Sequence, residues 1–187
     1  MNVYDFDKTI YDGDSTVDFY LFSLRRHKKI LLLAPSLLAA VTKFYVLRRG
    51  SKTDFKQVMY RFLRYVDMKK DLPDFWEGHA GKIKAFYLRQ QKKDDVIISA
   101  SPEFLLAPIC RQLDINCLMA SRVHPQTGIY DGINCHGKEK VRRFYEKFPD
   151  GVIDDFYSDS HSDDPLAEIA TRAYIVKKEV LTDWNNG

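Results

Sequence analysis

The chain has 187 residues and a mass of 21.8 kDa, which fits one compact domain, or a core with one small domain attached. It is 45% hydrophobic and 29% charged, and this balance excludes an intrinsically disordered chain. The formal net charge of +3 lacks the strong basic excess of nucleic-acid binders, so we expect no nucleic-acid partner.

Cysteine usage and the opening residues favour the cytoplasm. Cys110, Cys117 and Cys135 form no CxxC pair, so neither a disulfide framework nor a zinc site is predicted. The opening residues MNVYDFDKT contain no basic and then apolar signal region. We therefore expect a protein that stays in a reducing, cytoplasmic compartment.

The first predicted strand, Val3-Tyr4, leads directly into the segment Asp5-Phe6-Asp7-Lys8-Thr9. Side chains alternate along a strand, so Asp5 and Asp7 are expected on one face at the strand end, where open α/β sheets place their sites. Two converging carboxylates need a cation, and an oxygen-only ligand set favours Mg²⁺. Taken alone, the segment could equally be a solvated turn.

Residues 15–90 carry helical patterns only. The apolar run 30–47 is flanked by basic clusters on both sides and contains Pro35 and Lys43. We therefore expect amphipathic or buried helices there rather than a membrane span. Residues 15–90 have 16 Lys and Arg against 6 Asp and Glu, a net charge of +10, whereas the rest of the chain has a net charge of −7.

Two more helices are predicted in the second half of this segment. Apolar residues recur at helical spacing over 55–66 and again over 74–91. Asp71-Leu72-Pro73 lies between them and predicts a break, because proline ends or kinks a helix.

Beyond residue 90, apolar runs of buried-strand type alternate with helical patterns. The predicted strands are 96–98, 117–119, 151–157 and 174–176, and the predicted helices are 103–113, 138–147 and 165–171. A glycine-containing hairpin pattern at 124–137 interrupts this alternation. The predicted fold class is therefore α/β, with a doubly wound, mostly parallel sheet and an inserted all-helical segment.

Three further segments carry residues suited to phosphate chemistry. Ser99 stands at a strand-to-helix turn, where its hydroxyl and free N–H groups could bind phosphate oxygens. Lys140, in the first turn of the helix after Gly137, could neutralise phosphate charge. Asp159 and Asp163 follow the next strand among small polar residues, a pattern typical of a metal-binding loop. Singly, these could be an ordinary helix start, a solvated basic face and an Asp-rich turn.

In this order the four pieces resemble the haloacid dehalogenase (HAD) superfamily, and in particular its phosphoserine-phosphatase-like subgroup. The matching motifs are DxDxT at 5–9, the serine at 99, GxxK ending at 140 and SDSxxD at 158–163. The resemblance spans essentially the whole chain. It implies a Rossmann-like catalytic core formed by residues 1–14 and 91–187, with residues 15–90 as an inserted helical cap.

The resemblance implies a Mg²⁺-dependent phosphatase. Asp5 would be the nucleophile that forms an aspartyl-phosphate, and Asp7 would act as general acid and then as general base. Thr9 would orient their loop.

The same resemblance assigns the phosphate and metal ligands. Ser99, Ala100 and Lys140 would hold the phosphoryl oxygens. Asp5, the backbone carbonyl of Asp7 and Asp159 would bind the Mg²⁺. Asp163 would belong to the metal site indirectly, by orienting Lys140 and the metal.

The cap would select the substrate, with Asp14 at the hinge. Arg61 and Arg64 lie near the position of the cap arginine of phosphoserine phosphatases, but neither is in register. The basic charge and the apolar run 30–47 also depart from those caps. The substrate therefore stays open between a small phosphomonoester and a phospholipid headgroup such as phosphatidylglycerophosphate, met at the inner surface of an anionic membrane.

Two other classes of protein combine some of these features. A non-enzymatic phospho-acceptor of the response-regulator type shares the acidic cluster, the serine or threonine and the lysine, but it lacks a helical insertion. A membrane-binding scaffold with a degenerate site is disfavoured because every motif residue is present. Phosphotransferase or mutase activity would use the same residues as hydrolysis.

Overall fold

The computed structural model describes residues 1–49 and 52–186 and has a six-stranded sheet at its centre. The strand order is β3-β2-β1-β4-β5-β6. The first five strands run parallel, and β6 pairs antiparallel with β5. The strands are β1 Val3–Tyr4, β2 Val96–Pro102, β3 Cys117–Ser121, β4 Ile153–Ser158, β5 Ala170–Lys177 and β6 Val180–Asp183. The predicted mostly parallel sheet is confirmed, and β6 is an addition to it.

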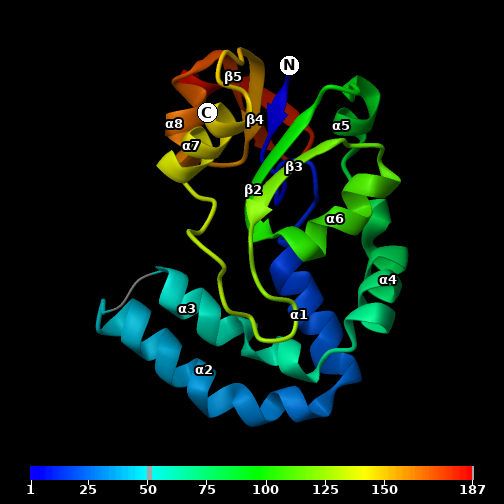
Figure 1. Ribbon diagram of the computed structural model, residues 1–187, viewed down its shortest axis with the longest axis vertical. Coiled ribbons are helices and arrows are strands. Elements are labelled where there is room, and N and C mark those ends of the chain that lie inside the picture. The colour runs from blue at the N-terminus through cyan, green and yellow to red at the C-terminus, as the bar shows by residue number, and fades with distance from the viewer. Residues whose placement is uncertain (50–51, 187) are drawn as a thin grey trace.

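Helices cover both faces of the sheet. Successive strand residues point to opposite sides, and because the central strands are apolar at successive positions, both faces need to be buried. On one side, Val3 and Ile98 pack with Phe144 of α7 (Lys138–Lys147) and with α8 (Asp164–Ala167). On the other side, Tyr4 and Ile97 pack with α6 (Glu103–Gln112), α4 (Met68–His79) and α5 (Ala85–Gln90). Figure 1 shows these two layers, and they make the sheet doubly wound.

The described residues of the segment between β1 and β2 form helices and turns, and none of them belongs to the sheet. It begins with α1 (Ser15–Arg26) and includes α2 (Ala34–Val41) and α3 (Lys52–Met59). In Figure 1, α2 and α3 lie side by side, away from the sheet. Their pairing is fixed in part by Phe44, whose ring stacks on Phe55 at 5.3 Å between centroids.

The apolar run 30–47 is not the buried core of this helical segment. The structure has one helical stretch over Lys28–Val46, formed by a 3₁₀ turn, α2 and a π-helical turn. The most apolar 18 residues of this stretch have a mean hydropathy of 1.5, and only 6% of them are buried. Leu32, Leu38 and Val46 are 73%, 67% and 71% exposed. Pro35 lies in the first turn of α2, where a missing N–H costs no hydrogen bond, so the helix continues through it. By length and composition alone, this stretch could cross a membrane.

The predicted break at Asp71-Leu72-Pro73 is wrong, because α4 runs through it. The helix begins after Asp67, whose carboxylate accepts a hydrogen bond from Lys69 N at 3.1 Å. Asp71 is buried, and its carboxylate lies 2.6 Å from His27 Nε2 and 3.3 Å from Arg26 Nε. These distant partners hold Asp71 inside the helix.

The other predicted helices differ mainly in where they end. The predicted helix 55–66 divides into α3 and a 3₁₀ segment, Tyr60–Tyr65. The predicted helix 74–91 divides into α4 and α5. The predicted helix 165–171 shortens to α8, because β5 begins at Ala170.

The segment 124–137 reaches from the sheet to the helical insertion (Figure 1). It makes one antiparallel bridge, between Val123 and Tyr130, rather than a full hairpin. At its tip Gly128 has a φ of +74°, and a Cβ there would lie 2.5 Å from Cβ of Tyr60. Glycine is therefore required where this loop meets the insertion.

Candidate active site

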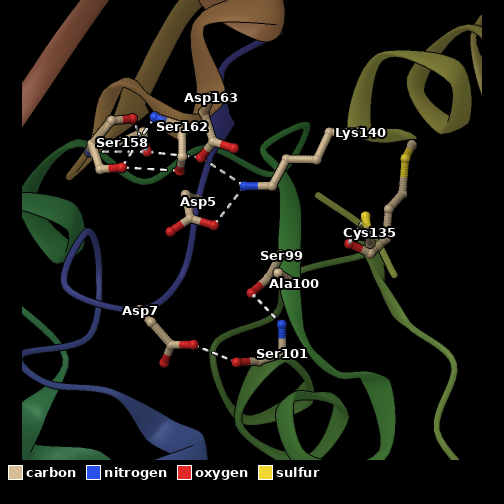
Figure 2. A network of polar contacts seen from close by, with 12 residues as sticks. Asp5, Asp7, Ser99, Ala100, Ser101, Cys135, Lys140, Ser158, Ser162 and Asp163 are labelled. Atoms are coloured by element: carbon tan, nitrogen blue, oxygen red, sulfur yellow. Dashed lines mark hydrogen bonds and ion pairs between the residues drawn. The ribbon is translucent and has the colours of Figure 1, made fainter. Parts of the chain in front are cut away.

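A cavity of about 520 Å³ opens where β1, β2 and β4 end and the inserted helices begin. All four sequence motifs contribute to it, and Figure 2 shows their side chains from close by. The carboxyl ends of neighbouring parallel strands meet at one edge of a sheet, which is why segments far apart in sequence converge here. The motif residues that line the cavity are Asp5, Asp7, Ser99, Ala100, Lys140, Asp159 and Asp163.

A buried lysine joins two of the motif carboxylates. Lys140 Nζ lies 2.7 Å from Asp5 Oδ1 and 2.7 Å from Asp163 Oδ2. Asp163 Oδ2 also accepts a hydrogen bond from Ser158 Oγ at 2.8 Å. Burial opposes the charge on Lys140, but the two carboxylates outweigh it and raise the pKa of the ammonium above its usual range. Lys140 therefore stays a cation, and it holds Asp5 and Asp163 together.

Asp5 lies at the end of β1 and is buried. Burial raises the pKa of its carboxyl above the usual range, and the attraction of Lys140 offsets this only in part. The carboxylates of Asp163 and Asp7 raise the pKa of Asp5 further. A further cation bound in the cavity would favour the ionised form of Asp5 and lower the pKa of its carboxyl again.

Asp7 is held by donors from two different elements. Its Oδ1 accepts from the backbone N of Ser15 at 2.7 Å, and its Oδ2 accepts from Ser101 Oγ. Burial, with a further contribution from Asp14, raises the pKa of Asp7 to about 6, although these hydrogen bonds lower it. A carboxyl that titrates near neutral pH is suited to exchange protons with a substrate.

The end of β2 places Ser99 and Ser101 close to the carboxylates. Ser99 is buried, and its Oγ accepts from Ser101 N at 3.1 Å. The hydroxyl of Ser99 can still donate to a ligand. Ala100 lines the cavity between them. Ser101 was not predicted, but it lies two residues after Ser99, so strand alternation alone would have placed both serines on one face.

Thr9 lies away from the cavity surface. It is fully buried, and within the described ranges its hydroxyl has no hydrogen-bond partner. The residue before it, Lys8, has a φ of +59° and lines the cavity. The predicted orienting role of Thr9 would therefore depend on packing rather than on a hydrogen bond.

The donor chemistry of the cavity suits Mg²⁺. Asp5 and Asp159 both line it and offer carboxylate oxygens. Burial raises the pKa of Asp159, and Lys8 offsets this only in part. In the part of the chain that the structure describes, no three His, Cys, Asp or Glu side chains form a ready-made metal cluster. Mg²⁺ commonly takes only one or two carboxylates, with waters and phosphate oxygens as its other ligands, so this arrangement fits it.

The inserted helices supply the opposite wall of the cavity, which is mostly aromatic. Its side chains are Val17, Phe44, Tyr45, Phe55, Met59 and Tyr60. Lys56 also lines this wall, and its Nζ lies 3.2 Å from the carbonyl of Ala100. Sequence reasoning did not single out Lys56, although it precedes Tyr60 by one helical turn and so shares its face.

The predicted cap residues have different positions. Asp14 lines the cavity and caps α1, with its carboxylate accepting from Val17 N at 3.0 Å. Arg61 and Arg64 do not line it. They lie beside a separate depression, together with Gln126 of the long loop.

Comparisons with known proteins agree with this arrangement. The family model of haloacid dehalogenase-like hydrolase matches residues 3–168. Protein CicA of Caulobacter vibrioides is 37% identical over 81 residues, which are 40% of this chain and 36% of CicA. The match therefore spans about a third of that relative's length.

Two solved structures share the fold. A protein of unknown function from Bordetella pertussis Tohama I has a TM-score of 0.74 and 19% identity, with 92% of this chain and 87% of that chain covered. A phosphoserine phosphohydrolase-like protein from Francisella tularensis has a TM-score of 0.57 and 16% identity, with 92% and 86% covered.

Proposed function

Because the chain belongs to the haloacid dehalogenase-like hydrolase family, we propose that it is a phosphatase that hydrolyses a phosphomonoester through an aspartyl-phosphate on Asp5. The observation that carries this proposal is the buried ammonium of Lys140, 2.7 Å from Asp5 in a cavity that Asp7 and Ser99 also line. In this proposal residues 1–14 and 91–187 form the catalytic core, and residues 15–90 form the cap.

The reaction would proceed in two displacements. A carboxylate oxygen of Asp5 attacks phosphorus, the bond to the leaving oxygen breaks, and Asp7 gives that oxygen its proton. Asp7 then takes a proton from water, whose oxygen attacks phosphorus and breaks the bond to Asp5. Free phosphate leaves, and Asp7 is again protonated for the next turnover.

The phosphoryl group would be held by cations and donors during both steps. Ser99 and Lys140 would donate to its oxygens, and Asp163 would keep Lys140 in place. Mg²⁺ held by Asp5, the carbonyl of Asp7 and Asp159 would offset the repulsion between carboxylate and phosphate.

Turnover of an aryl phosphate tests the proposal. We expect the protein to release phosphate from p-nitrophenyl phosphate in the presence of Mg²⁺ and to lose activity with excess chelator. Asp5→Asn should abolish turnover, whereas Asp150→Asn, which alters an exposed aspartate, should leave it unchanged. Equal turnover in the Asp5→Asn protein would refute the nucleophile. A stable phosphoprotein without phosphate release would indicate a phospho-acceptor instead.

A second candidate substrate is a lipid phosphomonoester at an anionic membrane. The helical stretch Lys28–Val46 contributes Phe44 and Tyr45 to the cavity wall, and the same stretch exposes leucines to solvent. Exposed apolar surface of this kind marks an interaction site. The substrate cavity and the apolar surface therefore adjoin each other.

Charge favours an anionic membrane as the partner of this surface. The exposed basic residues at the two ends of the stretch include Arg25, Lys28, Lys29, Arg48 and Arg49. Each such residue near an anionic lipid surface contributes about 1 kcal/mol of attraction, while apolar side chains enter the interface.

Vesicle sedimentation and substrate comparison test this second candidate. We expect binding to vesicles rich in phosphatidylglycerol but not to pure phosphatidylcholine, and we expect the double variant Leu32→Glu, Leu38→Glu to abolish binding while it keeps aryl phosphatase activity. Phosphatidic acid in mixed micelles should be hydrolysed faster than glycerol 3-phosphate. Failure to bind anionic vesicles at low salt, or faster turnover of phosphoserine, would refute the lipid substrate.

A further inference from the structure

Lys84 is a buried lysine whose ammonium contacts the catalytic loop rather than a carboxylate. It is 5% exposed, and its Nζ donates to the backbone carbonyl of Lys8, the residue after Asp7. Across residues 1–49 and 52–186, no carboxylate lies within salt-bridge distance of it. Burying an ammonium against a single carbonyl is costly, so such a contact needs an explanation.

The carbonyl that Lys84 binds belongs to a residue in an unfavourable conformation. Lys8 has a φ of +59°, and residues other than glycine rarely adopt this left-handed region. Its N–H donates to the carbonyl of Gly13 at 2.8 Å. Both backbone polar groups of Lys8 are therefore held, and such a conformation persists when its surroundings fix it from several sides.

Lys84 is itself held firmly in place. Its own N–H donates to the carbonyl of Ile10 at 2.8 Å, and the neighbouring Lys82 carbonyl accepts from Asp12 N at 2.8 Å. The carboxylate of Glu179 accepts from the N–H groups of the next two residues, at 3.3 and 2.9 Å. The segment from Lys82 to Lys84 thus braces the chain just after Asp7.

Three carboxylates from different parts of the chain act on the ammonium of Lys84. Burial lowers the pKa of Lys84, and the carboxylates of Asp12, Glu179 and Asp159 oppose this lowering. Asp159 comes from the loop after β4, so the charge of a second motif loop also acts on Lys84.

We propose that Lys84 is a positioning residue for phosphoryl transfer, because it fixes the Lys8 carbonyl and with it the turn that presents Asp7 to the cavity. The inference rests on the proposed function. Lys84 would not touch the substrate, so it would affect the rate of the chemical steps more than substrate binding. A misplacement of about 1 Å in such a group costs about 100-fold in rate.

Steady-state kinetics of Lys84→Met with p-nitrophenyl phosphate test this role. We expect kcat to fall about 10- to 100-fold while KM stays within about twofold of the wild-type value. Lys84→Arg keeps a donor of similar reach and should restore most of kcat. The matched control is Lys82→Met in the same segment. It keeps the backbone carbonyl of residue 82 that braces Asp12 and removes only the exposed ammonium that binds Asp18, so it should leave kcat unchanged.

The outcomes separate this inference from the proposed function. An inactive wild-type protein would refute the phosphatase itself. An active wild type with an equally active Lys84→Met protein, or an equal loss in Lys82→Met, would overturn the role of Lys84. If Lys84→Met does not fold by circular dichroism, Lys84→Gln decides in its place, and wild-type kcat in that variant would overturn the inference.

Discussion

The ammonium of Lys140 lies 2.7 Å from the carboxylate of Asp5, and both groups are buried. Removing the ammonium in Lys140→Met would leave Asp5 and Asp163 as like charges, with no cation for the phosphoryl group. We expect aryl phosphatase activity to fall at least about 100-fold and the free energy of unfolding at pH 8 to fall by about 3–5 kcal/mol. Lys138→Met, on the exposed side of the same helix, is the control and should retain both the phosphatase activity and the free energy of unfolding of the wild type.

The role of Asp7 can be separated from that of Asp5 by the choice of leaving group. An alkoxide leaves poorly and needs a proton, whereas p-nitrophenolate leaves without one. We expect Asp7→Asn to reduce hydrolysis of an alkyl phosphate by about 100- to 10,000-fold and to reduce p-nitrophenyl phosphate hydrolysis much less in the first displacement. The pre-steady-state burst of released p-nitrophenolate or alcohol measures this step, because phosphate leaves only in the second displacement. Equal loss on both substrates would contradict the general-acid role.

The raised pKa of Asp95, which lies outside the site, predicts that the stability of the protein depends on pH. Burial raises the pKa of its carboxyl to about 6, and one of its oxygens is buried without a hydrogen-bond partner among the described residues. The folded protein thus binds this proton more tightly than the unfolded chain does. The stabilisation is complete below about pH 4 and is lost as the pH rises through about 6.

The asparagine in Asp95→Asn cannot ionise, so the variant should not lose stability as the pH rises through about 6. We expect its free energy of unfolding to exceed the wild-type value by about 1–3 kcal/mol above pH 7, and the difference to vanish towards pH 4. Urea denaturation at the two pH values measures it, with Asp150→Asn as an exposed control. A difference that grows on acidification would contradict the sign.

Gly128 offers a test of the contact between the long loop and the helical insertion. An added methyl group in Gly128→Ala would meet Cβ of Tyr60 at 2.5 Å and its carbonyl oxygen at 2.6 Å. We expect a loss of about 1–3 kcal/mol in the free energy of unfolding. Gly132→Ala separates clash from backbone strain, because Gly132 has a φ of +92° with nothing within 4 Å of the added carbon. Gly132→Ala should therefore lower the free energy of unfolding by less than Gly128→Ala does.

Sequence patterns identified the sheet and the motif residues because both depend on local rules. Buried parallel strands are continuous apolar runs, and Gly137 before an amphipathic pattern marked the start of α7 at Lys138. The motif carboxylates and Ser99 converge because they follow β1, β2 and β4 of one parallel sheet, and strand ends at one edge are neighbours whatever their separation in sequence. Lys140 instead reaches them from the first turn of α7.

Features set by distant contacts escaped the same reasoning. Asp71 is typical of a turn in sequence, yet its bonds to Arg26 and His27 hold it inside a helix. β6 is short and mostly exposed at the edge of the sheet, so it carries no buried-strand pattern. The aromatic wall and Lys56 depend on how α2 and α3 pack, and no local pattern encodes that packing.

The central position of β1 has a consequence for biosynthesis. Val3 pairs with Val96 on one side and with Phe156 on the other, so the strand that carries Asp5 finds its neighbours only after the helical insertion has been translated. Pairings between residues so far apart in sequence form slowly, since long chain segments must be ordered first. On the ribosome, the helical insertion emerges before the sheet can close. A nascent chain that has not yet exposed Lys140 and Asp163 holds Asp5 without its counter-charge, and we expect it to be inactive.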